Sequence, residues 1–291
     1  MNYKLAVFTD EVSQDLAKAL ALAKEFNVSG VEIRSVWEHG PHLLSDNEVS
    51  QIGKAVKEAG MQVACIASPM FKCELEDKEA VKTHLGILDR CLEVADRLGA
   101  KVVRGFTFWK RKPVADVWDE VLSEFKPVKE RMKGSKILLG IENEYSVYIS
   151  KASDLKRFLD TLDCPEIRGI WDPANMLFDP DGEKVYPDAY QIVRPYIVHM
   201  HLKDAVKDAG EGKPKCVPIA DGAAVLGPQL KALDQDGYNG YISLETHWRP
   251  TKLDEETLRK PGGKEFSESG EFASRLCLEN LMRILKEQGI Q

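Results

Sequence analysis

Short β-branched segments alternate with longer amphipathic segments along the whole chain, and this alternation limits the fold more than any other feature. Strands are expected over residues 4–10, 30–34, 62–68, 101–108, 136–144, 167–175, 197–204 and 240–246. Helices are expected over residues 15–27, 46–59, 78–98, 114–133, 151–162, 188–196, 223–236 and 273–288. Strict alternation of this kind predicts parallel strands that are joined by right-handed crossovers.

The number of expected strands and the length of the chain favour a closed barrel over an open sheet. An open, doubly wound sheet usually has fewer strands, and its fingerprint G-x-G-x-x-G does not follow the first expected strand. A (β/α)8 barrel typically takes about 250 residues, and the chain has 291. We therefore expect an α/β protein with a single (β/α)8 TIM barrel that spans residues 1–291 as one domain.

Local signals mark several helix boundaries. Ser45 followed by Glu48 predicts a capping box at the start of the second expected helix. Glycines follow four charged helix ends, where a left-handed residue is expected to end the helix. These glycines are Gly60, Gly99, Gly134 and Gly237.

Charge and composition argue against several classes of partner. The chain carries 40 Lys and Arg against 47 Asp and Glu, a net charge of −7, so a global basic surface for nucleic acid is not expected. No apolar run approaches the roughly 20 residues that cross a bilayer, and the first residues lack a secretory pattern. The six cysteines are scattered without a C-x-x-C pair, which predicts free thiols. We expect a cytoplasmic protein that binds neither nucleic acid nor membranes.

Three acidic residues and a histidine stand at the ends of four consecutive expected strands. They are Glu142, Asp172, His201 and Glu245. Active sites of (β/α)8 barrels lie at the C-terminal ends of the strands, so these side chains should converge. Burying such charges without partners is costly, and one divalent cation would satisfy all four. The pattern therefore predicts a metal site.

Each of these residues also fits an ordinary structural role when it is taken alone. A strand-end glutamate is often a salt-bridge partner, Asp172 opens an Asp-Pro turn, and a single histidine is often a hydrogen-bonded core residue. Four of them on four successive strands favour the metal site. His199 and His201 also share one face of their strand, because strand side chains alternate with period two.

Three carboxylates and one imidazole suit Mn²⁺, Mg²⁺ or Co²⁺, and Zn²⁺ stays open as a further ion. An octahedral ion with four protein ligands keeps two positions, which adjacent oxygens of a hydroxy-ketone could occupy. A carboxylate at the edge of the ion could also take a proton from the carbon beside the carbonyl.

The strand-end motifs resemble those of the xylose isomerase-like barrel superfamily. The resemblance covers nearly the whole chain, and the nearest branch is the sugar phosphate isomerase/epimerase group, which includes ketose 3-epimerases, hydroxypyruvate isomerase and inosose dehydratase. The matching motifs are Ile-Glu142-Asn, Trp-Asp172-Pro-Ala-Asn, His-Met-His201-Leu-Lys-Asp and Ser-Leu-Glu245-Thr-His, with further likeness in Thr9–Ser13, Gly30–Arg34 and Gly237–Trp248.

The resemblance implies that Glu142, Asp172, His201 and Glu245 bind the metal. It also implies that Glu142 and Glu245 exchange the substrate proton on opposite faces, as the two metal-bound glutamates do in ketose epimerases.

Two positions depart from the epimerase pattern and put sugar epimerisation in doubt, although they leave the metal site intact. Asn175 stands where epimerases usually carry a histidine, and Tyr148 stands where they carry a further glutamate. The pair Lys203-Asp204 looks more like the inosose dehydratase side of the group.

Further residues near the strand ends are candidates for substrate binding. These candidates are Glu32, Arg34, Trp109, Asn175 and Lys203. Glu32 and Arg34 could instead form a structural ion pair, and Trp109 could close the barrel mouth by packing. Lys203 could bind an anionic or enolate oxygen, or it could be a solvated charge. Arg104 could reach a phosphate. The polar segment 249–270 is expected as a long loop, of a length often found in lids.

The leading function is a metal-dependent isomerase or epimerase of a small polyhydroxylated carbonyl compound. The alternative is a dehydratase of the inosose or dehydroshikimate type, which would use the same enolate. A hydrolase related to endonuclease IV needs several more histidines than the six present, and a non-catalytic binding barrel is the fourth reading. A homodimer or tetramer is expected by analogy with the family only.

Overall fold

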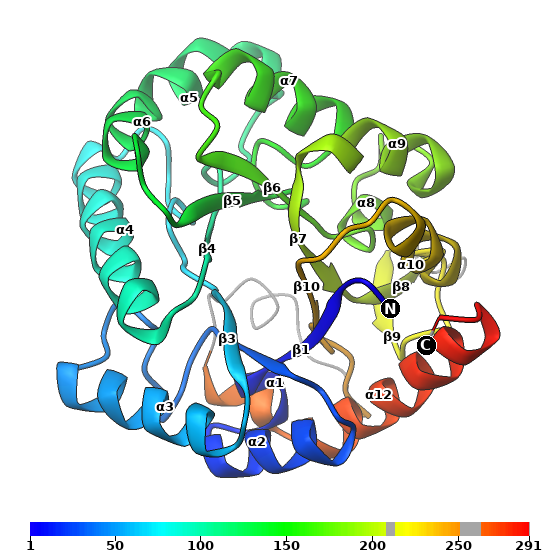
Figure 1. Ribbon diagram of the computed structural model, residues 1–291. Coiled ribbons are helices and arrows are strands. Elements are labelled where there is room, and N and C mark those ends of the chain that lie inside the picture. Colours follow the sequence, from blue (N-terminus) through cyan, green and yellow to red (C-terminus); the bar gives the residue numbers. More distant parts are fainter. Residues whose placement is uncertain (208–212, 251–262, 291) are drawn as a thin grey trace.

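The computed structural model describes residues 1–207, 213–250 and 263–290. Its centre is a closed barrel of parallel strands in the order β1-β10-β7-β6-β5-β4-β3-β2 (Figure 1). All eight expected strands are present, and most end a few residues earlier than predicted, which confirms the barrel. Their bounds are β1 Lys4–Phe8, β2 Gly30–Ile33, β3 Gln62–Ile66, β4 Val102–Gly105, β5 Leu138–Glu142, β6 Ile167–Trp171, β7 Ile197–Leu202 and β10 Tyr241–Leu244.

Helices surround the barrel (Figure 1). Most of their buried apolar residues belong to the same core cluster as those of the strands. The long helices are α2 Leu16–Glu25, α3 Asp46–Glu58, α4 Lys78–Leu98, α7 Ala152–Leu162, α10 Leu226–Gln235 and α12 Gly270–Glu287. Short helical elements lie between them: α1 Thr9–Val12, η1 Val114–Asp116, α8 Asn175–Phe178 and η4 Lys264–Ser267. None of the helices in the described ranges has both the length and the apolar character that a membrane span requires.

Two expected helices are broken into shorter pieces. The helix predicted over 114–133 divides after η1 into α5 Trp118–Glu124 and α6 Lys126–Met132, with Pro127 in the first turn of the second piece. The helix predicted over 188–196 is replaced by η2 Val185–Ala189, α9 Tyr190–Val193 and η3 Arg194–Tyr196. Proline lacks a backbone N–H and begins a helical turn more readily than it continues one, which explains both divisions.

The local boundary signals are confirmed. The Ser45 backbone N–H donates to Glu48 Oε2 (2.7 Å), and the Glu48 N–H donates to Ser45 Oγ (3.3 Å), which forms the capping box of α3. Gly60, Gly99, Gly134 and Gly237 all have φ near +75°. All six cysteines lie in the described part of the chain and are free.

The barrel interior is apolar at one end and charged at the other. Cys65, Val102 and Ile170 form a small buried cluster against which Val198 packs. Further along the same strands, towards their C-terminal ends, the buried side chains are polar or charged, and His199 is the first of them on β7. The fold therefore concentrates buried charge at the C-terminal mouth.

A two-stranded antiparallel sheet that we did not predict follows β7. It consists of β8 Asp204–Lys207 and β9 Pro214–Val217, and it lies next to α8. The seventh strand was expected to end at Asp204, whereas β7 ends at Leu202 and Asp204 begins β8. Of the predicted loop 249–270, residues 251–262 lie outside the described residues; η4 lies within it and buries Phe266.

The Asp204 carboxylate fastens this small sheet to the segment before α10. It accepts hydrogen bonds from the backbone N–H groups of Ala205 (3.0 Å), Ala220 (3.1 Å), Gly222 (3.0 Å) and Ala224 (3.0 Å). Hydrogen bonds to a buried carboxylate are stronger than neutral ones, so they hold the segment close. A Cβ atom at Gly222 would overlap Asp204 Oδ1 and the Ala205 nitrogen.

We predict that Gly222→Ala destabilises the fold, because the new methyl group forces the Asp204 carboxylate out of its hydrogen bonds. The free energy of unfolding should fall by about 2 kcal/mol or more, as measured by urea unfolding. The matched control is Gly86→Ala in α4, where a Cβ meets nothing within 4 Å. That change should stabilise the helix by about 0.5–1 kcal/mol. Equal effects of the two substitutions would contradict the role given to Asp204.

Candidate metal centre

The four strand-end residues predicted to bind a metal converge at the C-terminal mouth of the barrel. Glu142 ends β5, Asp172 directly follows β6, His201 lies in β7 and Glu245 directly follows β10. One donor atom from each lies within 4.8 Å of the others, and all four side chains are buried. They converge because β5, β6, β7 and β10 are consecutive in the barrel.

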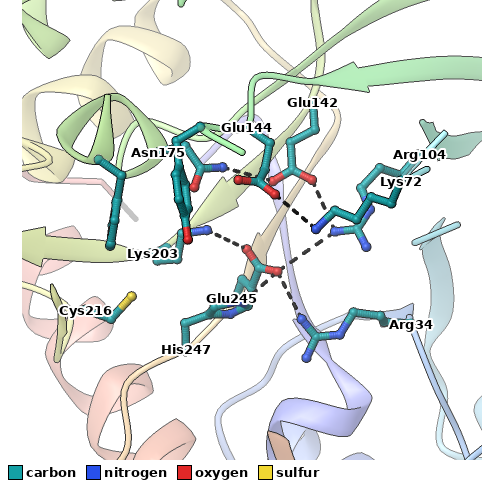
Figure 2. Close-up of a pocket in the computed structure, with 12 residues that line it drawn as sticks. Arg34, Lys72, Arg104, Glu142, Glu144, Asn175, Lys203, Cys216, Glu245 and His247 are labelled. Carbon is teal, nitrogen blue, oxygen red and sulfur yellow. Dashed lines mark hydrogen bonds and ion pairs between the residues drawn. The ribbon is translucent and has the colours of Figure 1, made fainter. Parts of the chain in front are cut away.

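Direct contacts link the four residues. His201 Nδ1 lies 3.1 Å from Glu142 Oε1. The Lys203 ammonium lies between the other two carboxylates. It is 2.7 Å from Asp172 Oδ2. It is also 3.1 Å from Glu245 Oε2, a contact drawn in Figure 2. It thus bridges two of the predicted ligands.

Asp172 divides its two oxygens between the backbone and this centre. Oδ1 accepts hydrogen bonds from the N–H groups of Ala174 (2.9 Å) and Asn175 (3.2 Å). Oδ2 is buried and makes no hydrogen bond with the described residues, although the Lys203 ammonium is close. A buried carboxylate oxygen that accepts no hydrogen bond needs another partner, and a metal ion could be that partner.

The buried charges around the centre are two positive charges short of neutrality when the histidines are neutral. Five permanently charged cations face seven carboxylates, which a divalent ion would balance. The carboxylates are Asp10, Glu11, Glu32, Glu142, Glu144, Asp172 and Glu245, and the cations are Arg34, Lys72, Arg104, Lys203 and Arg249. The donor set and its charge therefore fit a divalent metal ion held by Glu142, Asp172, His201 and Glu245.

Glu32 orients the histidine of this set. Its Oε1 lies 3.3 Å from His201 Nε2, and its Oε2 lies 2.8 Å from His199 Nε2. A metal-binding histidine usually donates its second N–H to a carboxylate or a carbonyl oxygen, which fixes the ring. Glu32 thus directs Nδ1 of His201 towards Glu142 and the centre. His199 also lines a second cavity, whose wall includes Lys4 and Tyr241 at the N-terminal end of the barrel.

Glu11 anchors a second group of charges beside the centre. It pairs with Arg34 (2.7 Å), with Arg249 (2.6 Å) and with His247 Nδ1 (2.9 Å). Arg34 also binds Asp10 and Glu245, so one guanidinium joins three carboxylates. These contacts account for the closeness of Glu11, Glu245 and His247 without a second ion.

Protonation in the metal-free protein follows from this crowding. Burial opposes a charge on His201, but the carboxylates of Glu142 and Glu32 outweigh it and raise the pKa of the imidazole to about 10. Burial likewise works against the Glu142 carboxylate, yet His201 and Arg104 lower its pKa to about 2. The pKa of Asp172 rises to about 6 because burial outweighs Lys203. At neutral pH the imidazolium therefore supplies part of the missing positive charge.

A cavity lies next to the centre and opens at the barrel mouth. Three of the five predicted substrate-binding residues line it: Arg34, Asn175 and Lys203. The Asn175 side chain donates to the Asn143 carbonyl (2.9 Å) and to Glu142 Oε1 (3.4 Å), so it stands beside a predicted ligand. The complete lining is Arg34, Lys72, Arg104, Glu142, Glu144, Tyr145, Asn175, Phe178, Lys203, Cys216, Glu245 and His247.

Glu32 and Trp109 do not line this cavity, so a role for either in substrate binding stays a prediction. Glu32 is fully buried beneath His201. The Trp109 ring instead lies 5.6 Å from the Lys72 ammonium. Tyr148, one of the two departures from the epimerase pattern, is fully buried and does not line the cavity either.

Sequence reasoning missed several residues of this site. Glu144 stands two residues after Glu142 in the sequence, and this spacing was a signal that could have been used. Lys72, Glu11 and Arg249 follow no periodic pattern. Lys72 and Arg249 lie in loops and Glu11 lies in the short helix α1, and the course of these segments depends on contacts with distant parts of the chain.

Comparisons with known proteins agree with this architecture. A family model described as xylose isomerase-like TIM barrel matches residues 20–272. No curated protein matches the sequence.

Solved structures with the same fold share little sequence with the chain. A xylose isomerase-like TIM barrel protein from Mycobacterium smegmatis, in complex with magnesium, is 16% identical with a TM-score of 0.70 over 98% of this chain and 96% of that one. A probable 3-DHS dehydratase from Bacillus anthracis is 14% identical (TM-score 0.71, 96% and 98%). A 3-keto-D-glucoside 4-epimerase from E. coli is 16% identical (TM-score 0.68, 98% and 99%). These identities show a common fold only.

We predict that Glu32→Gln lowers the affinity for Mn²⁺ about 10- to 100-fold, because the His201 ring loses the carboxylate that orients it. Competition with a chelating indicator measures this affinity. The matched control is Glu48→Gln, which removes the carboxylate of an exposed glutamate–histidine pair (Glu48 to His39 Nδ1, 3.0 Å). An unchanged affinity in Glu32→Gln would contradict the orienting role.

We also predict that metal binding releases about one proton at neutral pH. A metal ion needs the free lone pair of His201 Nδ1, and the pKa of about 10 means that this nitrogen is protonated in the metal-free chain. The apparent affinity should therefore rise about tenfold per pH unit between about pH 7 and 9, and more steeply below pH 6, where Asp172 is protonated too. Titration calorimetry in buffers of different ionisation enthalpy counts the protons, and zero release at pH 8 would refute the assignment.

Proposed function

Because the chain belongs to the xylose isomerase-like TIM barrel family, we propose that it is a metal-dependent isomerase or epimerase of a small polyhydroxylated carbonyl compound. Glu142, Asp172, His201 and Glu245 would hold the ion, and Glu142 and Glu245 would carry the substrate proton. The ion would supply Lewis acidity that makes the hydrogen beside a substrate carbonyl acidic.

One observation carries the proposal: two buried carboxylates face the same cavity, and each is held by a guanidinium. Glu142 Oε2 accepts a hydrogen bond from Arg104 Nη1 (3.2 Å), and Glu245 Oε1 accepts one from Arg34 Nη1 (3.2 Å). Arg104 Nη1 also lies 3.9 Å from Glu245 Oε1 (Figure 2). These contacts fix both carboxylates at the cavity wall, where proton transfer needs close and stable geometry.

The charge state of the two carboxylates suits proton acceptors. The pKa of Glu142 is about 2, as given above, and that of Glu245 lies well below its ordinary range, because Lys203, His247 and other cations outweigh burial. Both are therefore ionised at neutral pH. In an epimerisation one would take the proton from the substrate carbon and the other would return a proton to the opposite face; in an isomerisation the proton would return to the neighbouring carbon.

The second candidate is a dehydratase, and the placement of Lys203 favours it. The Lys203 ammonium lines the cavity and lies 3.1 Å from Glu245 Oε2. After Glu245 or Glu142 removes the proton beside the carbonyl, this ammonium could donate a proton to a departing β-hydroxyl group. Asn175 in place of the histidine of the epimerases points the same way. Both candidates share the first proton transfer.

We predict that Glu142→Gln and Glu245→Gln each lower turnover by about 10²- to 10⁴-fold at temperatures where the variants remain folded, because an amide cannot accept the substrate proton. The metal-loaded protein is incubated in D₂O with ketoses, keto-inositols and hydroxy-keto acids, and product masses are measured. Deuterium gain without loss of water indicates an isomerase or epimerase, and loss of water indicates a dehydratase.

The control for these variants is Glu124→Gln, which alters an ion pair with Lys78 (2.6 Å) outside the cavity. It should retain full exchange. If Glu245→Gln lost stability in proportion to activity, Glu245 would be a structural residue and the proposal would fail. Absence of deuterium uptake with Mg²⁺, Mn²⁺ and Co²⁺ across the whole panel would also count against it.

A further inference from the structure

Four Lys and Arg side chains line the cavity, and two of them, Lys72 and Arg104, keep N–H donors without an acceptor among the described residues. Arg34 binds three carboxylates, and Lys203 lies against two. Lys72, by contrast, has one oxygen partner among the described residues, Glu144 Oε2 at 3.0 Å. Its side chain is only 9% exposed, so few water molecules can take the place of the missing acceptors.

Arg104 is the second cation with donors to spare. Its Nη1 donates to Glu142 (3.2 Å) and lies 3.9 Å from Glu245 Oε1, and its Nε donates to the Ser68 carbonyl (3.5 Å). Its Nη2, by contrast, makes no hydrogen bond within the described ranges. A metal ion bound to Glu142 would share the negative charge of the carboxylate that pairs with Arg104, so the guanidinium would be less fully neutralised. Figure 2 shows Lys72 and Arg104 together on the side of the cavity away from Lys203.

The segment that carries Lys72 is held in place from both sides. Phe71 has a left-handed backbone (φ +60°), its N–H donates to His84 Nδ1 (2.8 Å), and its ring stacks on Phe108 (4.3 Å). The carbonyl of Phe71 accepts from the Phe108 N–H (2.9 Å). A strained residue that its surroundings enforce is a common device for positioning a functional side chain. The ammonium of Lys72 also lies over the Phe106 ring (4.5 Å), with the Arg104 guanidinium 4.8 Å from the same ring.

We propose that the substrate carries an anionic group, a carboxylate or a phosphate, which Lys72 binds together with Arg104. This inference rests on the proposed function, because it takes the cavity as the substrate site. It adds a specificity-determining residue, Lys72, at the end of the cavity away from Lys203. The substrate would place its carbonyl at the metal ligands and its charged group at Lys72, so a neutral sugar of the same size would bind more weakly.

The test compares three probes that share a keto-hexose skeleton: D-fructose, D-fructose 6-phosphate and 5-keto-D-gluconate. Their affinities for the Mn²⁺-loaded chain and for the metal-free chain are measured by titration calorimetry. We expect at least one anionic probe to bind at least about tenfold more tightly than fructose, since hydrogen bonds between charged groups are the strong ones. Whichever of the two anionic probes binds more tightly shows whether the site prefers a phosphate or a carboxylate.

Variants of Lys72 assign this preference to one side chain. Lys72→Met keeps the length and the apolar stem and should remove the preference for the anionic probe, while the affinities for fructose and for Mn²⁺ change less than about threefold. Lys72→Arg should restore the preference. The matched control is Lys110→Met, because Lys110 pairs with Asp179 (3.3 Å) and does not line the cavity.

Each outcome decides the matter. The inference is overturned if no anionic probe binds more tightly than fructose, or if Lys72→Met keeps the preference or weakens all probes equally. Failure of the proposed function has a different signature. In that case the Lys72-dependent preference would persist, while no probe or panel compound exchanged deuterium with any metal.

Discussion

Seven carboxylates are buried towards the C-terminal mouth of the barrel, and the need to neutralise them governs the structure of the site. Removing one partner of a buried ion pair typically costs about 3–5 kcal/mol, so each cation in such a cluster has a structural task. Arg34 illustrates this, since its guanidinium reaches Asp10 and Glu11 from α1 as well as Glu245 after β10. The charges therefore tie the first and last strands of the closed barrel together. The remaining shortfall of two positive charges is what a divalent ion would fill.

The parts of this arrangement that depend on periodicity could be predicted from the sequence. Strand–helix alternation defines a parallel barrel, and parallel strands bring their C-terminal ends to one edge. Glu142, Asp172, His201 and Glu245 could therefore be brought together before any coordinates were known. The capping box of Ser45 and Glu48 and the four helix-ending glycines followed from equally local rules.

The other parts depend on contacts between distant residues, which a single sequence does not display. Arg249 reaches Glu11 across 238 positions, and Lys72 is placed by a left-handed Phe71 within a cluster of rings. The sheet of β8 and β9 is held by backbone N–H groups that converge on Asp204, and backbone donors carry no sequence signature. Glu32 is a related case: the residue was singled out correctly as unusual, but its buried carboxylate bonds to two imidazoles instead of lining the cavity.

In a barrel of this type, one face is usually assigned to chemistry and the other to stability. The shared carboxylate of Glu32 links the two faces. His199 forms part of the wall of a cavity at the N-terminal end, and its Nε2 is hydrogen-bonded to one oxygen of Glu32. The other oxygen of Glu32 is bonded to His201 Nε2, and the remaining ring nitrogen of His201 faces the predicted metal ligand Glu142. Three buried side chains, His199, Glu32 and His201, are thus joined by hydrogen bonds inside the barrel. Substitutions around His199 would therefore change how firmly the His201 ring is held, with no substitution at the cavity where substrate would bind.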